Sequence, residues 1–70
     1  MIIEVFKTNV QEVCEAQQLT YLLLDNFPES RINFDLHDCD KILRVEGGDV
    51  LVSKVIAVIR KNGFTCTVLA

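Results

Sequence analysis

The chain has 70 residues, a hydrophobic fraction of 50% and a formal net charge of −3 at pH 7. This length holds a single small domain, residues 1–70, and the apolar fraction suffices for an aliphatic core without disulfides or a metal. A nucleic-acid-binding domain would carry a basic patch, whereas the seven Lys and Arg residues are scattered, so we expect no nucleic-acid partner.

The cysteines and the apolar segments indicate the compartment. Cys14, Cys39 and Cys66 are an odd, widely spaced set, which does not form a disulfide framework. We see no leader pattern, and the longest apolar run, residues 50–59, is too short to cross a bilayer. The sequence therefore predicts a reduced, cytoplasmic protein without a membrane partner.

The first part of the chain predicts a strand followed by a helix. Alternating residues favour a strand over 2–6. Asn9 followed by Glu12 has the form of a capping box, so we expect a helix from there to Asn26, before the helix-breaking Pro28. Two stripes at helical spacing form its apolar face: Val13, Ala16, Thr20, Leu23 and Phe27, and Val10, Cys14, Tyr21 and Leu24.

The second part predicts a hairpin, a helix and a last strand. Residues 31–37 and 43–46 alternate between apolar and polar types, and the polar "HDCD" segment between them is typical of a turn. The stretch "DVLVSKVIAVIRKNG" has apolar residues at helical spacing, so we interpret it as a helix with Asp49 as N-cap and Gly63 as the C′ residue. The closing "FTCTVLA" favours a strand.

The order β-α-β-β-α-β predicts a ferredoxin-like α+β sandwich, in which two helices cover one face of a four-stranded antiparallel sheet of order 4-1-3-2. In this topology three connections lie at the same end of the sheet, which we call the pole: residues 7–10, 38–40 and 62–64. We expect these three turns to be neighbours in space.

Over its whole length the chain resembles a heavy-metal-associated domain, the fold of copper chaperones and of the metal-binding repeats in copper-pumping ATPases. The element order, the length and the "NGF" turn before the last strand carry the resemblance. In that family the first strand is followed by Gly-Met-x-Cys-x-x-Cys, whose thiolates bind Cu(I) or another soft ion. Here Lys7 and Thr8 stand at the glycine and methionine positions, and Val10 and Val13 at the cysteine positions. The resemblance implies the family fold with a degenerate metal site, and we expect both valines to pack against the core.

The pole offers a candidate site for a ligand or partner. Lys7, Thr8 and Asn9 precede a predicted helix N-terminus, whose free N–H groups and dipole attract anions, and Lys61 is expected near the same end. The expected ligand is a small anion or an acidic group of a partner. The alternative is a capped helix start beside a solvated lysine.

Potential metal ligands occur in the "HDCD" turn. We expect no metal, because structural zinc usually takes four ligands and no second ligand pair is visible. The alternative is an atypical copper or zinc carrier that uses His37 and Cys39, with Cys14 as a further candidate ligand. Otherwise Cys14 and Cys66 are expected in or near the core as small hydrophobic residues.

These features favour a non-enzymatic binding or interaction module. No cysteine has an evident base and third group for catalysis, and the glycine-rich loop with a catalytic arginine found in acylphosphatase, which shares the fold, is missing. A protein partner would bind at the pole or at an edge strand. The uncharged last strand is such an edge, so a homodimer formed through it is a further expectation.

Overall fold

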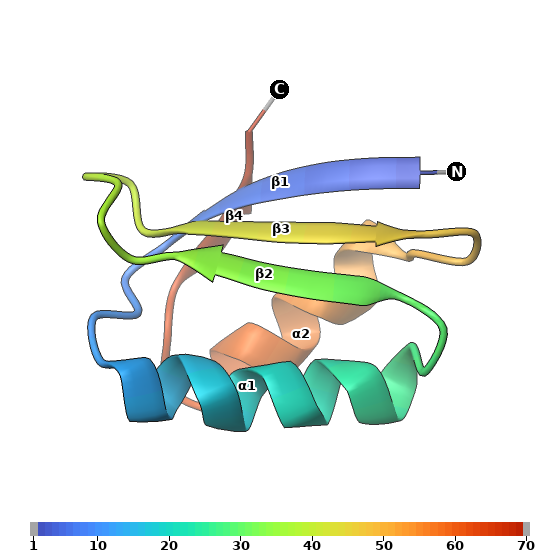
Figure 1. The fold of residues 1–70 in the computed structure, drawn as a ribbon, viewed down its shortest axis with the longest axis horizontal. Helices are drawn as coiled ribbons and strands as arrows, with labels where there is room; N and C mark the ends of the chain where they lie inside the picture. The colour runs from blue at the N-terminus through green and yellow to red at the C-terminus, as the bar shows by residue number, and fades with distance from the viewer. Residues whose placement is uncertain (1, 70) are drawn as a thin grey trace.

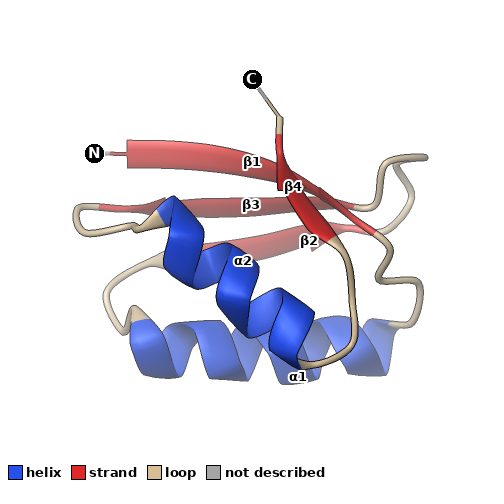
Figure 2. Cartoon of the chain, turned by 180° about the vertical axis from the view of Figure 1, so that it is seen from behind, coloured by secondary structure: helices blue, strands red, loops and turns tan. Residues whose placement is uncertain are grey.

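The computed structural model describes residues 2–69 as one sheet covered by two helices on one face (Figure 1 and Figure 2). In chain order the elements are β1 (Ile2–Thr8), α1 (Val13–Asn26), β2 (Arg31–Asp35), β3 (Ile42–Gly47), α2 (Val52–Lys61) and β4 (Cys66–Val68). The strands are antiparallel and follow the order β2-β3-β1-β4. The predicted ferredoxin-like fold and strand order are confirmed. Within the described range, neither helix is long and apolar enough to cross a membrane.

The two edges of the sheet differ in length. β2 pairs with β3 along all five of its residues, whereas β4 pairs only with Phe6, Lys7 and Thr8 of β1. The N–H of Leu69 donates one more hydrogen bond to the carbonyl of Val5, at 2.8 Å. Beyond that bond, the first residues of β1 have no described strand on their outer side.

The core lies between the sheet and the helices. Alternating strand residues point toward the helices, so Phe6, Leu43 and Val45 are completely buried. The helices meet them with aliphatic side chains of similar burial: Leu19, Leu23, Val55 and Ile59. As predicted, the alternation in β3 separates these buried residues from the exposed Arg44 on the open face.

Both helices begin later than the sequence predicts. Glu12, not Asn9, is the N-cap of α1, and it exchanges capping-box hydrogen bonds with Glu15. Leu51, not Asp49, is the N-cap of α2, without a side-chain cap. In each case a buried valine, Val10 or Val50, lies just before the helix. Burying this side chain draws the preceding segment into the core, and the helix begins only after it.

The core-facing stripe of α1 also differs from the prediction. Ala16, Leu19 and Leu23 are its buried residues. At roughly 100° per residue, Cys14 and Tyr21 lie far round the helix from this stripe. Cys14 is exposed and Tyr21 is 75% exposed, so the prediction that they contribute to the apolar core face is wrong.

The end of α2 agrees with the prediction. Gly63 has φ +90° and occupies the C′ position. Its N–H donates to the carbonyl of Arg60 at 3.0 Å, and the N–H of Phe64 donates to the carbonyl of Ile59 at 3.3 Å. These two bonds form a Schellman motif, which satisfies carbonyls left free at the helix end.

We expect Gly63→Ala to lower the free energy of unfolding by about 1–2 kcal/mol, because an L-residue is strained in the left-handed region. A Cβ at Gly63 would have no atom within 4 Å, so the cost is conformational. Gly48→Ala is the matched control, since Gly48 also has open space but no positive φ. Urea unfolding of both variants checks this, and equal midpoints for the two would contradict it.

Candidate functional site

Hydrogen bonds join the three connections at the pole. The Thr8 hydroxyl donates to the carbonyl of Lys41 at 2.6 Å, which ties the β1–α1 connection to the β2–β3 turn. The Asn9 Oδ1 accepts the N–H of Thr65 at 2.8 Å, which ties the same connection to the segment before β4. The predicted meeting of these three turns is confirmed, and Figure 1 shows the β1–α1 connection and the β2–β3 turn at the same end of the sheet.

The predicted ligand-binding residues of the pole mostly contact the protein itself. Thr8 is buried, and its hydroxyl also accepts the N–H of Val10 at 3.3 Å. The Lys7 Nζ lies 3.6 Å from a carboxylate oxygen of Asp40. The structure therefore places Lys7, Thr8 and Asn9 together, with their polar groups used in contacts between the turns.

Lys61 lies elsewhere on the surface. It lines a shallow depression with Leu22 and Asn26 of α1 and with Val58 of its own helix. No hydrogen bond or ion pair within residues 2–69 joins it to the other three residues predicted for the pole.

We expect Thr8→Val to lower the free energy of unfolding by about 1–3 kcal/mol, because the nearly isosteric valine leaves the Lys41 carbonyl and the Val10 N–H without their partner. Thr67→Val is the matched control, since Thr67 is an exposed strand residue. Chemical denaturation measures both. A Thr8→Val variant as stable as the control would contradict the assigned role of this hydroxyl.

The "HDCD" turn is tightly folded. The Asp38 carboxylate accepts the N–H of Asp40 at 2.8 Å, and Lys41 adopts a positive φ of 47°. The Lys41 N–H donates to the carbonyl of Asp38 at 3.0 Å, and its Nζ donates to the carbonyl of Leu36 at 2.9 Å. The Asp38 side chain thus caps a turn whose Lys41 has a left-handed backbone and whose Lys41 carbonyl accepts the Thr8 hydroxyl.

The predicted metal-ligating residues are distributed over two places. Ligand atoms of Asp38, Cys39 and Asp40 all lie within 4.8 Å of one another. His37 is instead among the residues at one end of a groove beside α1, and Cys14 is exposed on that helix. Exposed groups of acidic residues are common without an ion, so this cluster alone does not indicate a metal.

The two valines at the family's cysteine positions have opposite environments. Val10 is completely buried, which confirms the expectation that it packs in the core. Val13 is the first residue of α1 and is 65% exposed, so the same expectation for Val13 is wrong. One of these two positions therefore faces the interior and the other faces solvent.

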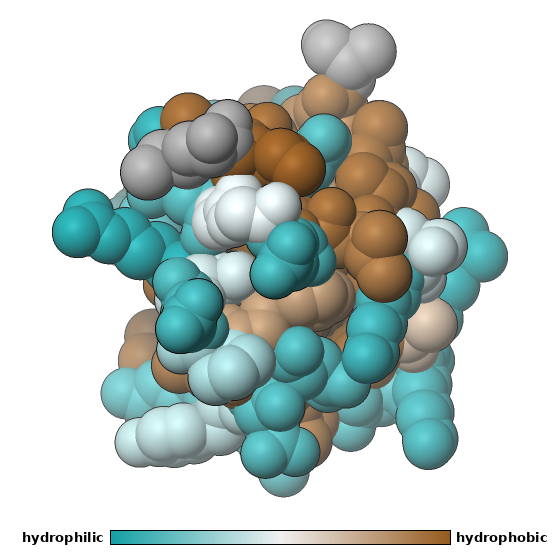
Figure 3. All heavy atoms as spheres, turned by 90° about the vertical axis from the view of Figure 1, so that its right-hand side faces the viewer, coloured by the Kyte–Doolittle hydropathy of each residue, from teal (hydrophilic) through white to brown (hydrophobic). Residues whose placement is uncertain are grey.

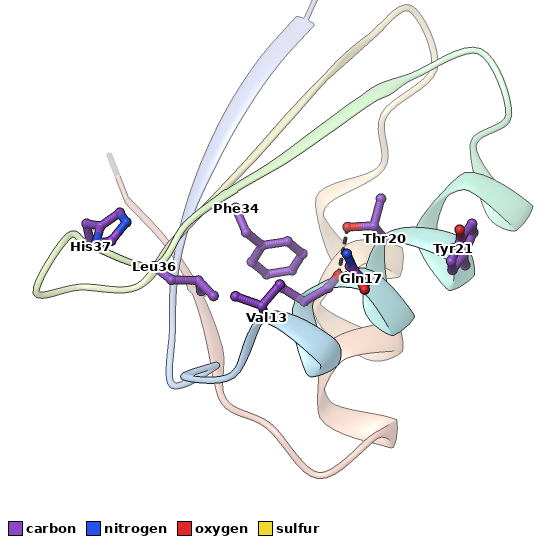
Figure 4. Close-up of a pocket in the computed structure, with 8 residues that line it drawn as sticks. Val13, Gln17, Thr20, Tyr21, Phe34, Leu36 and His37 are labelled. Atoms are coloured by element: carbon purple, nitrogen blue, oxygen red, sulfur yellow. Dashed lines mark hydrogen bonds between the residues drawn. The ribbon is translucent and has the colours of Figure 1, made fainter.

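A groove of about 460 Å³ lies between α1 and the edge strand β2. Figure 4 shows Phe34 pointing from β2 into the space beside the helix, with Val13 and Leu36 near one end. The complete lining is Val13, Ala16, Gln17, Thr20, Tyr21, Phe34, Leu36 and His37. The sequence prediction did not include this site. Its signal in the sequence is the apolar alternation of Phe34 and Leu36, whereas Tyr21 is assigned to the core face by its spacing.

In comparisons with known proteins, no family model matches the chain, and no curated protein or solved structure matches it significantly.

Proposed function

We propose that this chain is a non-enzymatic, cytoplasmic protein-interaction module with the heavy-metal-associated fold and a degenerate metal site. The βαββαβ order supports the fold assignment. The buried Val10, at the position of the family's first cysteine, supports the loss of the metal site, because a valine offers no ligand atom.

The groove between α1 and β2 is the observation that carries this proposal. It places apolar side chains at the surface: Val13 and the aromatic Tyr21 are exposed on the helix, and Phe34 of β2 and Leu36 of the following turn are only partly buried. Aromatic and aliphatic anchors in a groove, with a polar surround, are typical of protein interfaces. We therefore infer that the groove binds a segment of another protein.

Selection of peptides from a random displayed library tests this function. We expect binders whose affinity falls at least tenfold in Val13→Glu. Leu51→Glu is the matched control, because Leu51 is 60% exposed, Val13 is 65% exposed, and Leu51 lies outside the groove. Failure to select a binder, or binders that tolerate Val13→Glu, would overturn the groove as the functional site.

An atypical copper or zinc carrier is the alternative, suggested by the proximity of the Cys39 thiol to two carboxylates. Native mass spectrometry of the reduced protein with added Cu(I) or Zn(II) separates the two functions. The interaction module predicts no stoichiometric ion, and peptide binding that is unchanged in Cys39→Ser. One ion per chain that is lost in Cys39→Ser would favour the carrier, and His37 would be substituted next.

We also propose that the β1–β4 edge supports a homodimer. Ile2, Ile3, Val68 and Leu69 are exposed there, and Figure 3 shows an apolar surface over this part of the molecule. These four residues carry no charge, and an uncharged edge favours pairing with a second copy. Sedimentation equilibrium is expected to show a dimer that Ile3→Lys abolishes. A wild-type monomer at millimolar concentration would reject this interface.

A further inference from the structure

The edge strand β2 is open to pairing with another chain. It pairs with β3 on one side, and no strand within residues 2–69 lies on the other. An edge of this kind presents unpaired N–H and C=O groups. Its only charged residues, Arg31 and Asp35, stand at its ends, and it contains no proline. The middle of the strand therefore lacks the charges and the proline that commonly protect an edge.

The groove lies beside this same edge. Side chains on one face of a strand point the same way, so a strand added to β2 would direct every second side chain toward α1. There it would meet Val13 and Tyr21 from the helix, Phe34 from β2, and Leu36 from the turn just after β2. The open edge supplies main-chain hydrogen bonds and the groove supplies the side-chain contacts, which together define recognition by strand addition.

The length of the groove sets how many side chains it holds. Val13 and Tyr21 are eight residues apart in α1. This separation corresponds to about 12 Å along the helix axis. Side chains on one face of a strand recur about every 7 Å. The groove thus accommodates two apolar side chains separated by one residue.

The charge around the groove indicates the chemistry of the partner. No Lys or Arg occurs from residue 8 to residue 30, a segment that contains Glu12, Glu15, Asp25 and Glu29. At the end where Leu36 and His37 line the groove, Asp38 is accompanied by a cation, because the Lys41 Nζ donates to the carbonyl of Leu36 at 2.9 Å. The acidic excess around the groove therefore comes from the segment that contains α1, and complementary charge on a partner is positive.

A second copy of the chain fits this site less well. Pairing of two β2 edges would continue the sheet and bring α1 beside its symmetry mate. Since α1 has acidic residues and no basic residue, the two helices would repel each other. The β1–β4 edge, where the exposed Ile2, Ile3, Val68 and Leu69 are uncharged, is the better surface for self-association.

We propose that the β2 edge and the adjoining groove bind an extended, cationic segment of a partner protein as a fifth strand of the sheet. Two alternate apolar side chains of that segment occupy the groove, and Lys or Arg residues flank them beside α1. This inference rests on the proposed function and specifies its ligand. It assigns the affinity to main-chain pairing and the specificity to the apolar pair and the charge.

Synthetic peptides test the proposal directly. The probe is the acetylated and amidated peptide KKITIS, and three controls accompany it. EEITIS reverses the charge, KKIPIS removes a central N–H and disfavours pairing, and KKSTSS removes the apolar pair. We expect KKITIS to bind, and each control to bind at least tenfold more weakly at low ionic strength. The advantage over EEITIS should shrink at 0.5 M salt, because salt screens charges.

Amide hydrogen exchange then locates the added strand. Bound KKITIS is expected to slow exchange at outward-facing amides of β2 by tenfold or more and to leave β4 unchanged. Binding of KKITIS without protection of β2 would overturn strand addition. Equal binding of EEITIS would overturn the prediction that the partner segment is cationic. Neither result would contradict the proposal that the protein is an interaction module. If neither KKITIS nor a peptide from the displayed library binds, the proposed function fails as well. Protection of β2 in concentrated protein without peptide would identify a second copy as the occupant and overturn the proposal.

Discussion

Val10→Asp is expected to unfold the domain, whereas Val13→Asp is expected to leave its stability nearly unchanged. Val10 is completely buried, and an unpaired carboxylate at such a position costs several kcal/mol. A chain of this length has a total stability of roughly 4–10 kcal/mol. Val13 is exposed and stands in the first turn of α1, where a negative charge interacts favourably with the helix dipole.

Circular dichroism with urea titration measures both variants under the same conditions. The pair compares one chemical change at two positions three residues apart. Two variants of equal stability would show that the loop after β1 is open around Val10, as a metal-binding loop of the resembled family would be. If Val10→Asp unfolds and Val13→Asp does not, the loop after β1 is part of the core.

Cys66 is expected to react with iodoacetamide at least a hundredfold more slowly than Cys14 or Cys39. Its side chain is completely buried, whereas the other two are exposed. Burial raises the pKa of the Cys66 thiol from 9.0 to about 11, against a smaller lowering by Arg60. The reactive species is the thiolate, so a pKa raised by about two units lowers its population at pH 8 about a hundredfold.

Intact mass spectrometry is expected to show two rapid additions and a third only after unfolding in urea. Cys14→Ser should show one rapid addition, which controls for the assignment. Three additions at similar rates in the folded protein would contradict the burial of Cys66.

The same pKa makes stability depend on pH. Because the pKa is higher in the folded state, the thiol's contribution is complete below pH 9 and is lost as the pH rises from 9 to about 11. The loss approaches 3 kcal/mol at most. Cys66→Val should not show this loss of stability between pH 9 and 11. If the wild type and Cys66→Val lose the same free energy of unfolding as the pH rises, groups other than Cys66 cause the loss.

The sequence was sufficient to predict the architecture because the signals for it are local. Alternation in the hairpin, Pro28 after α1 and Gly63 after α2 each constrain the backbone within a few residues. The helix starts were wrong because they depend on distant contacts. Asn9 looks like a cap, but its side chain accepts a hydrogen bond from Thr65, 56 residues away in sequence.

The candidate site was harder to predict for a related reason. The rotation of α1 about its axis decides which of its side chains face the sheet. Val10 is buried in the core just before the helix begins and helps to set this rotation. The sequence alone allowed Cys14 and Tyr21 on the core face. Only the packed structure places Tyr21 outward and brings it to the groove with Phe34.

The hydrogen bonds that join the three connections of the pole also bear on the order of folding. β2 and β3 form a local hairpin, but β1 pairs with β3 and β4, which come much later in the chain. Such pairings close long loops and form slowly. The Asn9–Thr65 bond connects the two ends of the chain, so it cannot form until both outer segments have docked. In pulse-labelling exchange during refolding, the Thr65 amide should become protected after the amides of the hairpin.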